Sequence, residues 1–153
     1  MNNKPKAIIF DMDGTLADVR GIRHYLRPTP PSRKKDFDAF HSESVDCPPN
    51  SAVVNHAMVA HLLGYKILIV TARRHMWRHH TAWWLALHGV PSDMLIMRGD
   101  ADNRPDYLVK RDMLATLRRA YTIVHAVDDN PSVIALWNEE GIPTTIVEGW
   151  EDE

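Results

Sequence analysis

Short apolar runs alternate with helix-length stretches along most of this 153-residue chain, and this alternation constrains its fold more than any other feature. The runs have the length of strands and cover residues 7–10, 67–70, 94–97, 123–127 and 144–147. Strands that alternate with helices predict a parallel sheet with right-handed crossover connections. We therefore predict an α/β fold: a three-layer Rossmann-like domain with a central parallel sheet of about five strands.

The stretches between the runs have the features of helices, and they cover residues 51–63, 75–88, 106–119 and 131–140. Gly64 and Gly89 follow the first two, where a left-handed cap is expected, and Pro131 suits a first helical turn. Apolar residues at helical spacing in the first of these helices indicate one apolar face, formed by Val54, Met58, Val59, Leu62 and Leu63.

Residues 17–50 do not follow this alternation. They hold five prolines and have no clear strand period, so we predict an insertion after the first strand that forms a small cap or lid. A helix within 35–44 is expected, with Phe37 and Phe40 on one side. We expect one domain, residues 1–153, that includes this insertion.

Basic residues gather in the insertion, where residues 20–35 contain no Asp or Glu. The cations are Arg20, Arg23, Arg27, Arg33, Lys34 and Lys35. A phosphate-binding patch and a solvated loop are both compatible with this composition. The formal net charge of the whole chain is only −2, so the molecule as a whole does not attract polyanions.

Cysteine content and hydropathy indicate the compartment. Cys47 is the only cysteine, which excludes an intrachain disulfide. No apolar run approaches the length of a membrane span, and the run before Asp11 is too short for a signal peptide. We expect a cytoplasmic protein that does not contact a membrane.

Polar side chains follow three of the predicted strands. They are Asp11 and Asp13 after the first strand, Thr71 and Arg73 after the second, and Asp128 and Asp129 after the fourth. Arg104 and Lys110 lie before or within the first turns of the third helix. Each alone has a structural explanation, such as a turn, a helix cap or a surface lysine. Because the carboxyl ends of parallel strands meet at one edge, we expect them to lie together in a ligand-binding crevice.

These side chains support phosphoryl transfer to a carboxylate. An Asp that attacks phosphorus forms an aspartyl-phosphate and divides one difficult displacement into two easier steps. Clustered carboxylates suit Mg²⁺, which reduces the repulsion between the attacking anion and the phosphate. Asp11 and Asp128 are the candidate ligands, with Asp129 as a ligand or next to one. Asp13 is placed to act as general acid and then as general base.

The remaining groups of this set suit the phosphate. Lys110 and Thr71 are expected to hold the phosphate oxygens, where negative charge develops during the reaction. Arg73 or Arg104 is expected to clamp the same oxygens with two hydrogen bonds.

The sequence Asp11-Met12-Asp13-Gly14-Thr15, followed by Thr71, Lys110 and Asp128-Asp129, resembles the four motifs of the haloacid dehalogenase (HAD) superfamily of phosphatases. The resemblance implies that Asp11 is the nucleophile and Asp13 the acid/base residue, as expected of a phosphatase and not of a dehalogenase. It also implies Thr71 and Lys110 as phosphate-binding residues, Thr15 as a further substrate-binding residue, and Mg²⁺ held by Asp11, the main-chain carbonyl of Asp13 and Asp128.

The segments around these motifs resemble the 3′-phosphatase domain of phage-type polynucleotide kinase-phosphatases. The similar segments include Lys4–Phe10, Leu63–Ile67, Arg98–Lys110 and Ala126–Asp129. This resemblance implies a substrate with a 3′-phosphate at a DNA or RNA end and substrate-binding roles for Arg73, Arg98 and Arg104. It also implies a kinase or a ligase that acts on the same ends.

The chain departs from that family at three points. Asn130 stands where an arginine is expected after the Asp pair, so one phosphate contact is in question. Thr71-Ala72-Arg73 stands where Ser-Gly-Arg is common, a change that keeps a hydroxyl. The sequence also has no Gly-x-x-x-x-Gly-Lys-Ser/Thr motif, so it holds no P-loop kinase half.

Two other functions fit the same residues. Asp-Met-Asp-Gly followed by Leu-Ala-Asp also occurs in deoxyribonucleotidase-like sequences, which makes a small-molecule phosphatase such as a 5′-nucleotidase the alternative. A non-catalytic binding module on the HAD fold requires broken motifs, whereas all four are intact here.

Two further groups of side chains favour structural explanations. His75 and His79 are four residues apart but have no acidic or cysteine partner nearby, so a solvated helix face is favoured over zinc. Five large apolar residues on the second helix favour core or oligomer contacts over base stacking: Trp77, Trp83, Trp84, Leu85 and Leu87.

Overall fold

A computed structural model describes residues 3–27 and 34–150 of the chain. Its sheet has five parallel strands in the order β3-β2-β1-β4-β5. The strands are β1 (Lys6–Phe10), β2 (Lys66–Arg74), β3 (Met94–Arg98), β4 (Thr122–Asp128) and β5 (Thr144–Ile146). The predicted α/β fold with a parallel sheet is therefore confirmed, and each strand lies at its expected place.

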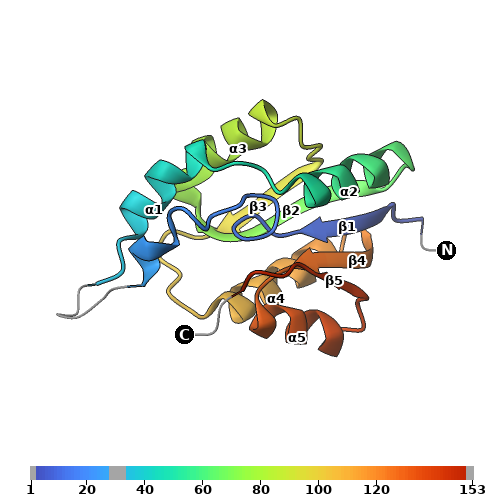
Figure 1. Cartoon of the computed structure of the whole chain (residues 1–153). Coiled ribbons are helices and arrows are strands. Elements are labelled where there is room, and N and C mark those ends of the chain that lie inside the picture. The colour runs from blue at the N-terminus through green and yellow to red at the C-terminus, as the bar shows by residue number, and fades with distance from the viewer. Residues whose placement is uncertain (1–2, 28–33, 151–153) are drawn as a thin grey trace.

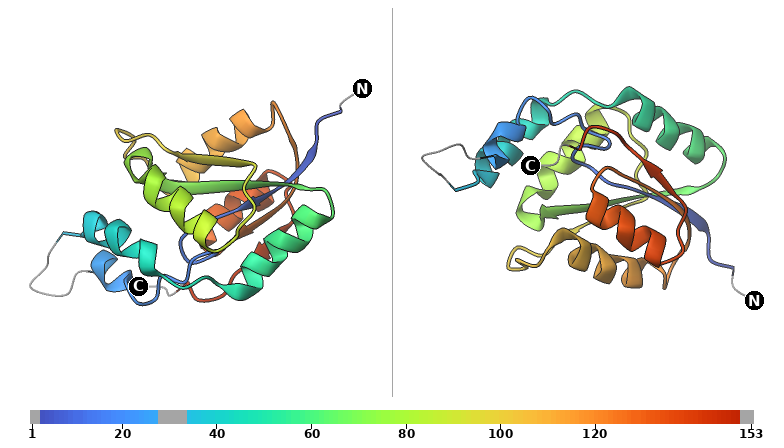
Figure 2. Two further views of the ribbon diagram at one scale, coloured as in Figure 1. Left: turned by 90° about the horizontal axis from the view of Figure 1, so that it is seen from above. Right: turned by 60° about the horizontal axis from the view of Figure 1, so that its bottom comes forward.

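Four helices cover the two faces of the sheet and complete three layers (Figures 1 and 2). They are α2 (Ser51–Leu62), α3 (Arg78–Leu87), α4 (Asp106–Leu117) and α5 (Pro131–Glu139). In Figure 1, α2 and α3 lie above the sheet, and α4 and α5 lie below it. The second predicted helix begins with a separate 3₁₀ turn, η3 (His75–Trp77), before α3. No helix in the described part of the chain is long and apolar enough to span a membrane.

Alternation of side chains along β1 divides the core into two layers. Ile8 and Phe10 pack with α2 and α3, whereas Ala7 and Ile9 pack with α4 and α5. All four are nearly inaccessible to solvent. A central strand buried on both faces reads as a continuous apolar run, which explains why β1 was recognisable in the sequence.

The buried face of α2 differs from the predicted one. Val53, Ala57 and Ala60 face the core, while Val54 is only partly buried. The rest of the expected face is exposed, with relative accessibilities of 37% for Met58, 46% for Val59, 76% for Leu62 and 72% for Leu63. Because apolar residues surround most of this helix, periodicity alone does not determine which side packs. The two alanines let the helix lie close to the sheet.

The 17–50 segment lies between β1 and α2, and its described residues form three short elements. They are the 3₁₀ turns η1 (Arg23–Leu26) and η2 (Ser44–Asp46) and the helix α1 (Phe37–Glu43). The helix expected within 35–44 is present, and Asp36 caps it by accepting a hydrogen bond from the Ala39 N–H at 3.0 Å. Residues 28–33, which include Arg33 of the predicted basic stretch, lie outside the described residues.

The strand order creates a switch point between β1 and β4. From β1 the chain proceeds outward to β2 and β3, and it then returns to the other side of β1 to form β4 and β5. Loops that leave adjacent strands in opposite directions open a crevice at the carboxyl edge of the sheet, where ligands bind in such folds. Asp11 follows β1 and Asp128 ends β4, so both lie at this switch point.

Candidate active site

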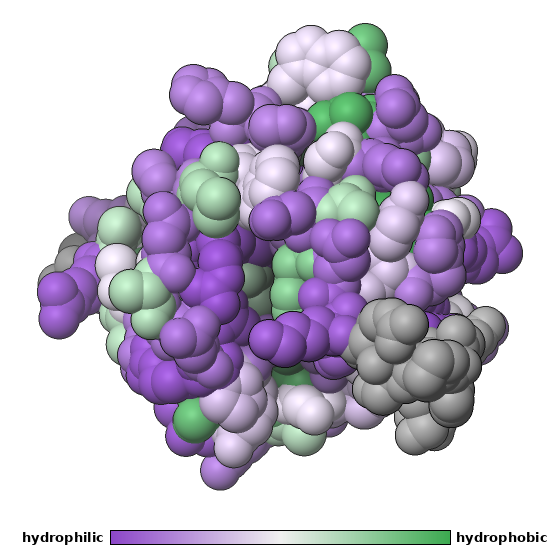
Figure 3. Space-filling model, turned by 90° about the vertical axis from the view of Figure 1, so that its left-hand side faces the viewer, coloured by the Kyte–Doolittle hydropathy of each residue, from purple (hydrophilic) through white to green (hydrophobic). Residues whose placement is uncertain are grey.

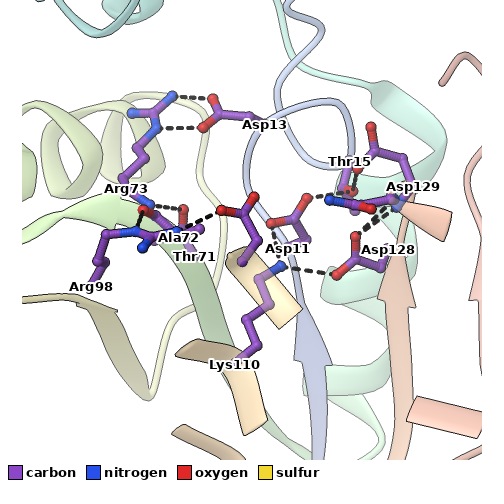
Figure 4. A network of polar contacts seen from close by, with 12 residues as sticks. Asp11, Asp13, Thr15, Thr71, Ala72, Arg73, Arg98, Lys110, Asp128 and Asp129 are labelled. Carbon is purple, nitrogen blue, oxygen red and sulfur yellow. Dashed lines mark hydrogen bonds and ion pairs between the residues drawn. The ribbon is translucent and has the colours of Figure 1, made fainter. Parts of the chain in front are cut away.

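Asp11 and Asp128 meet across the switch point through one lysine (Figure 4). The backbone N–H of Asp11 donates to the Val127 carbonyl at 3.0 Å, which fixes the end of β1 against β4. Lys110, in the second turn of α4, donates from Nζ to Asp11 Oδ1 at 2.8 Å and to Asp128 Oδ2 at 3.0 Å. Three predicted site residues from three separate elements therefore form one hydrogen-bonded group.

Burial gives this group unusual electrostatics. Asp11, Lys110 and Asp128 are all less than 10% accessible. Burial and the nearby Asp128 raise the pKa of Asp11 well above its ordinary value, although Lys110 opposes this. Burial by itself lowers the pKa of Lys110, but Asp11 and Asp128 outweigh that effect and raise it. Lys110 therefore keeps its charge in the protein interior.

Asp129 brings a third carboxylate to the same place. Its Oδ1 lies 3.3 Å from Thr15 Oγ1, and that hydroxyl also lies 3.0 Å from Asp11 Oδ2. Burial and the charge of Asp128 raise the pKa of Asp129 to about 6. Asp11, Asp128 and Asp129 each offer an oxygen within 4.8 Å of the others, so these three could hold a metal ion. The side chain of Asp13 is not part of this group.

Backbone N–H groups of the loop after Asp128 fix the position of its carboxylate. Asp128 Oδ1 accepts hydrogen bonds from the backbone N–H groups of Asp129 at 2.9 Å and Asn130 at 3.1 Å. Asn130, at the position where an arginine was expected, caps α5 by accepting from the Ser132 N–H at 3.0 Å. Its side chain therefore has a structural role at the start of the helix, although Asn130 also lines the pocket.

Gly14, in the first motif, packs against Asp129 of the last motif at a position that leaves no room for a side chain. Its φ is +77°, and a Cβ built there would lie 2.0 Å from Asp129 Oδ2 and 2.8 Å from its Cγ. The turn after Asp13 therefore passes directly against the Asp129 carboxylate.

Asp13 forms a two-point ion pair with Arg73. Arg73 Nε donates to Asp13 Oδ2 at 2.9 Å, Nη2 donates to Oδ1 at 2.5 Å, and Nη1 donates to Thr81 Oγ1 at 3.1 Å. Burial raises the pKa of Asp13, but the Arg73 guanidinium outweighs it and lowers the pKa below its ordinary value. Arg73 was expected to clamp the phosphate, and in this structure it binds Asp13 instead.

Strand β2 is longer than predicted, so Thr71 and Arg73 lie within it. Thr71 is buried, and its Oγ1 accepts from the Arg73 backbone N–H at 3.1 Å. Thr71 and Arg73 are two residues apart on the strand, so both side chains lie on the same face of the sheet, and both line the pocket.

Arg98 joins the strand edge to the following loop. Its Nε donates to the Ala72 carbonyl at 2.8 Å, and its Nη2 donates to Asp106 Oδ1 at 2.5 Å. Nη1 donates to the carbonyls of Asp102 at 3.0 Å and Arg104 at 2.6 Å. These bonds use four of the five guanidinium N–H groups, so Arg98 chiefly holds the loop.

Arg104 is half-exposed and forms ion pairs with two carboxylates that are close to it in the sequence. Its Nη2 lies 2.8 Å from Asp102 Oδ2 and 2.7 Å from Asp112 Oδ2, and its side chain is 47% accessible. Arg98 and Arg104 both line the pocket, where substrate-binding residues were expected. Their guanidinium groups bind Asp106 and Asp102 and not the cluster of Asp11, Asp128 and Asp129.

One pocket of about 990 Å³ contains the site. Figure 3 shows this end of the molecule, where a hollow with hydrophobic atoms inside it is bordered by hydrophilic side chains. The sequence analysis did not identify several residues that line it, among them Phe37, His41, Met76 and Trp150. The signal available for the first two was their spacing of four residues on the expected helix.

The large apolar residues after β2, which were expected to form core or oligomer contacts, have different surroundings. Trp84 and Leu85 are buried in the core, as expected, whereas Trp83 and Leu87 are exposed. Trp77, which we expected to form core or oligomer contacts, lines the pocket. The exposed His75 and His79 belong to no potential metal-binding group among the described residues.

Comparison with known proteins identifies the family. A sequence model of the polynucleotide kinase PNKP phosphatase domain matches residues 5–149. The chain belongs to this family. The predicted resemblance is thus confirmed, and the chain is a phosphatase-type domain with the HAD fold.

Individual relatives agree with this assignment. The chain is 25% identical over 147 residues to a protein of Autographa californica nuclear polyhedrosis virus named as a bifunctional polynucleotide kinase/RNA ligase, covering 92% of this chain and 19% of that protein. A solved structure named as a Pnkp1/Rnl/Hen1 complex is similar with a TM-score of 0.81 and 27% identity, covering 96% of this chain and 47% of its match.

A more distant structure shares the fold alone. The class C acid phosphatase from Bacillus anthracis with tungstate bound is similar with a TM-score of 0.73 and 15% identity, over 95% of this chain and 67% of that one. The chain spans less than half the length of the viral kinase/ligase relative and of the matched chain of the Pnkp1/Rnl/Hen1 complex.

Proposed function

We propose that this chain removes the 3′-phosphate from DNA or RNA ends in a Mg²⁺-dependent reaction that passes through an aspartyl-phosphate on Asp11. The observation that carries the proposal is the meeting of Asp11, Lys110 and Asp128 at the switch point, within a domain of the polynucleotide kinase phosphatase family. That arrangement supplies a nucleophile, a fixed cation and further carboxylates in one pocket.

In the first step, an Asp11 carboxylate oxygen bonds to phosphorus while the bond from phosphorus to the 3′ oxygen breaks. Asp13 gives its proton to that leaving oxygen. In the second step, Asp13 takes a proton from water, the water oxygen bonds to phosphorus, and the bond to Asp11 breaks. Inorganic phosphate and the 3′-hydroxyl end are the products.

The Asp13–Arg73 pair suits the second step directly, because a lowered pKa keeps Asp13 ionised as a base. For the first step Asp13 must carry a proton. A phosphate in the pocket favours this in two ways: its negative charge raises the pKa of Asp13, and it competes for the Arg73 guanidinium. Arg73 then serves first to orient Asp13 and next to hold the substrate.

The donor set fits a hard divalent cation. Asp11, Asp128 and Asp129 are buried carboxylates with oxygens within 4.8 Å, which is the ligand chemistry that Mg²⁺ prefers. Bound there, Mg²⁺ would neutralise negative charge on the phosphate that Asp11 attacks.

Hydrolysis of a 3′-phosphorylated oligonucleotide, followed by phosphate release with and without Mg²⁺, tests the proposal. We expect turnover with Mg²⁺, none with EDTA, and a loss of at least about a thousandfold in Asp11→Asn and Asp13→Asn. Asp46→Asn, an exposed carboxylate of η2 that lies outside the pocket lining, is the matched control and should keep full activity.

Other results of this assay would contradict the proposal. A strong preference for free 5′-mononucleotides over the oligonucleotide would assign a 5′-nucleotidase. Failure to hydrolyse any phosphomonoester with Mg²⁺ would assign a non-catalytic binding module. We further propose that a kinase or a ligase processes the same ends, because the name of the viral relative includes both activities.

A further inference from the structure

Three aromatic rings form a wall of the pocket on the side of the 17–50 segment. Phe37 and His41, one turn apart on α1, have ring centroids 6.4 Å apart and planes inclined by 20°. Trp77 of η3 continues the row, with its ring 5.5 Å from that of His41. All three line the pocket that contains Asp11 and Asp13. We call Phe37, His41 and Trp77 the ring wall.

Phe37 of the ring wall is more exposed than core packing requires. Phe37 is 53% accessible, although the neighbouring Phe40 on the same helix is 3% accessible and packs in the core. Met76, next to Trp77, is 58% accessible and lines the same pocket. Apolar surface gathered inside a polar pocket indicates contact with an apolar part of a ligand.

His41 provides a second, independent observation. His41 is only 8% accessible to solvent, and its Nδ1 has no hydrogen-bond partner among the residues described. A buried polar atom without a partner is uncommon in a folded protein, so this nitrogen indicates a group that arrives with a ligand. His41 lies in the pocket lining, but Nδ1 itself is almost inaccessible, so a ligand there meets this nitrogen once the imidazole ring turns.

The size of the pocket indicates what that ligand is. A volume of about 990 Å³ is at the upper end of the range for sites that enclose whole organic ligands, and it exceeds the needs of a phosphate group alone. The phosphate is expected at the carboxylates and Lys110, so the ring wall is left for the remainder of the substrate. Planar aromatic rings stack on nucleobases regardless of base identity.

We propose that the ring wall stacks on the terminal base of the 3′-phosphorylated strand and that His41 Nδ1 makes a hydrogen bond to the same nucleoside. This inference rests on the proposed function and assigns the part of the site that binds the leaving strand. It predicts that the terminal base contributes to turnover although it takes no part in the chemistry.

Two oligonucleotides that differ only at the 3′ end provide the test. One ends in a normal nucleotide with a 3′-phosphate, and the other ends in an abasic tetrahydrofuran residue with a 3′-phosphate. Because stacking on one base contributes roughly tenfold to hundredfold in binding, we expect the wild-type protein to prefer the normal end by about tenfold or more in kcat/KM.

Substitutions show which side chains produce the preference for the normal end. Phe37→Ala and Trp77→Ala should each reduce the preference several-fold, while Phe37→Tyr should keep it. His41→Phe retains a ring but removes both nitrogens, so a smaller reduction is expected. Trp83→Ala is the matched control, because Trp83 is 53% accessible, as Phe37 is, but lies outside the pocket lining. Its preference should equal that of the wild-type protein.

The possible failures are distinguishable. No turnover of either end would overturn the proposed function and this inference with it. Equal turnover of both ends by the wild-type protein would leave the phosphatase activity intact and overturn the inference alone. A preference that survives Phe37→Ala and Trp77→Ala, in proteins with wild-type circular dichroism spectra, would also overturn it.

Discussion

Lys110 and three of the arginines that line this pocket have contrasting surroundings. Lys110 lies among the buried carboxylates at the switch point, with both Asp11 and Asp128 in hydrogen-bond distance. Arg73, Arg98 and Arg104 surround that group and bind acids and carbonyls of the pocket wall. The contrast shows that the central charge follows from the strand order, whereas the outer charges organise the segments that enclose the substrate.

The largest effect should come from Lys110→Met. Removal of the ammonium leaves two buried carboxylates without their cation, so the free energy of unfolding should fall by about 3–5 kcal/mol. Turnover should fall by about a hundredfold to a thousandfold. Chemical denaturation and the oligonucleotide assay measure the two effects.

Lys66→Met is the control for this substitution. Lys66 Nζ lies 4.0 Å from Asp93, and its side chain is 47% accessible, so its loss should cost less than about 1 kcal/mol. If both variants were destabilised to the same extent, Lys110 would not have the central electrostatic role assigned to it.

Next in size is the difference between Arg98→Ala and Arg104→Ala. Loss of Arg98 leaves the carbonyls of Ala72, Asp102 and Arg104 without a donor, and unfolding should become easier by about 2–3 kcal/mol. Arg104 is half-exposed and its ion pairs are screened by solvent, so its loss should change stability much less than the loss of Arg98. Thermal unfolding of both variants gives the comparison. A larger effect from Arg104 would reverse the order of importance proposed for the two arginines.

Arg73→Gln should have a smaller effect that is visible mainly in the pH profile. Arg73 lowers the pKa of Asp13, so its removal lets Asp13 hold its proton to a higher pH. Because the second step needs ionised Asp13, the acid limb of its rate, followed as breakdown of the aspartyl-phosphate, should move to higher pH, with a loss of about tenfold at neutral pH. Arg78→Gln, whose side chain donates to the Leu95 carbonyl, should leave the limb in place. An acid limb that moves to lower pH would contradict the role given to the Asp13–Arg73 pair.

The smallest effect concerns Mg²⁺ and stability in the absence of substrate. The pKa of Asp129 in the folded protein, about 6, exceeds the ordinary value of 3.8. The metal-free protein therefore becomes less stable as the pH rises from 3.8 to about 6. Mg²⁺ at about five times its Kd should restore about 1 kcal/mol, or about 2–4 °C, at pH 7.5.

At pH 5 the cluster is protonated in part, so the same Mg²⁺ concentration should shift the melting temperature far less. Differential scanning fluorimetry at the two pH values measures this. Asp129→Asn should lose most of the shift at pH 7.5. An equal shift at both pH values would place the bound cation elsewhere on the molecule.

The sequence predicted the centre of the site better than its surroundings, and the reason is topological. Asp11 and Asp128 follow apolar runs that were predicted to be parallel strands, and parallel strands bring their carboxyl ends to the same edge of a sheet. Lys110 was identifiable through its motif. The partner of Arg73 was not, because the two-point pair joins β2 to the turn after β1, a contact made only in the tertiary structure.

Two other features show what local patterns leave undetermined. The helix α2 has apolar residues on most of its surface, so the alternative buried face of Val53, Ala57 and Ala60 could be decided only by packing on the sheet. The ring wall joins α1 to η3, and the contact between His41 and Trp77 arises from tertiary structure, not from sequence spacing.

Gly14 has a consequence for how sequences of this kind evolve. Since any Cβ at position 14 would collide with the Asp129 carboxylate, the two positions cannot vary independently. A lineage that loses this glycine must also shorten or displace the acid at position 129, which would dismantle the proposed cation site. An aligned set of relatives should therefore show coupled variation at these two positions, and a homologue with alanine at 14 and an intact Asp pair should be rare.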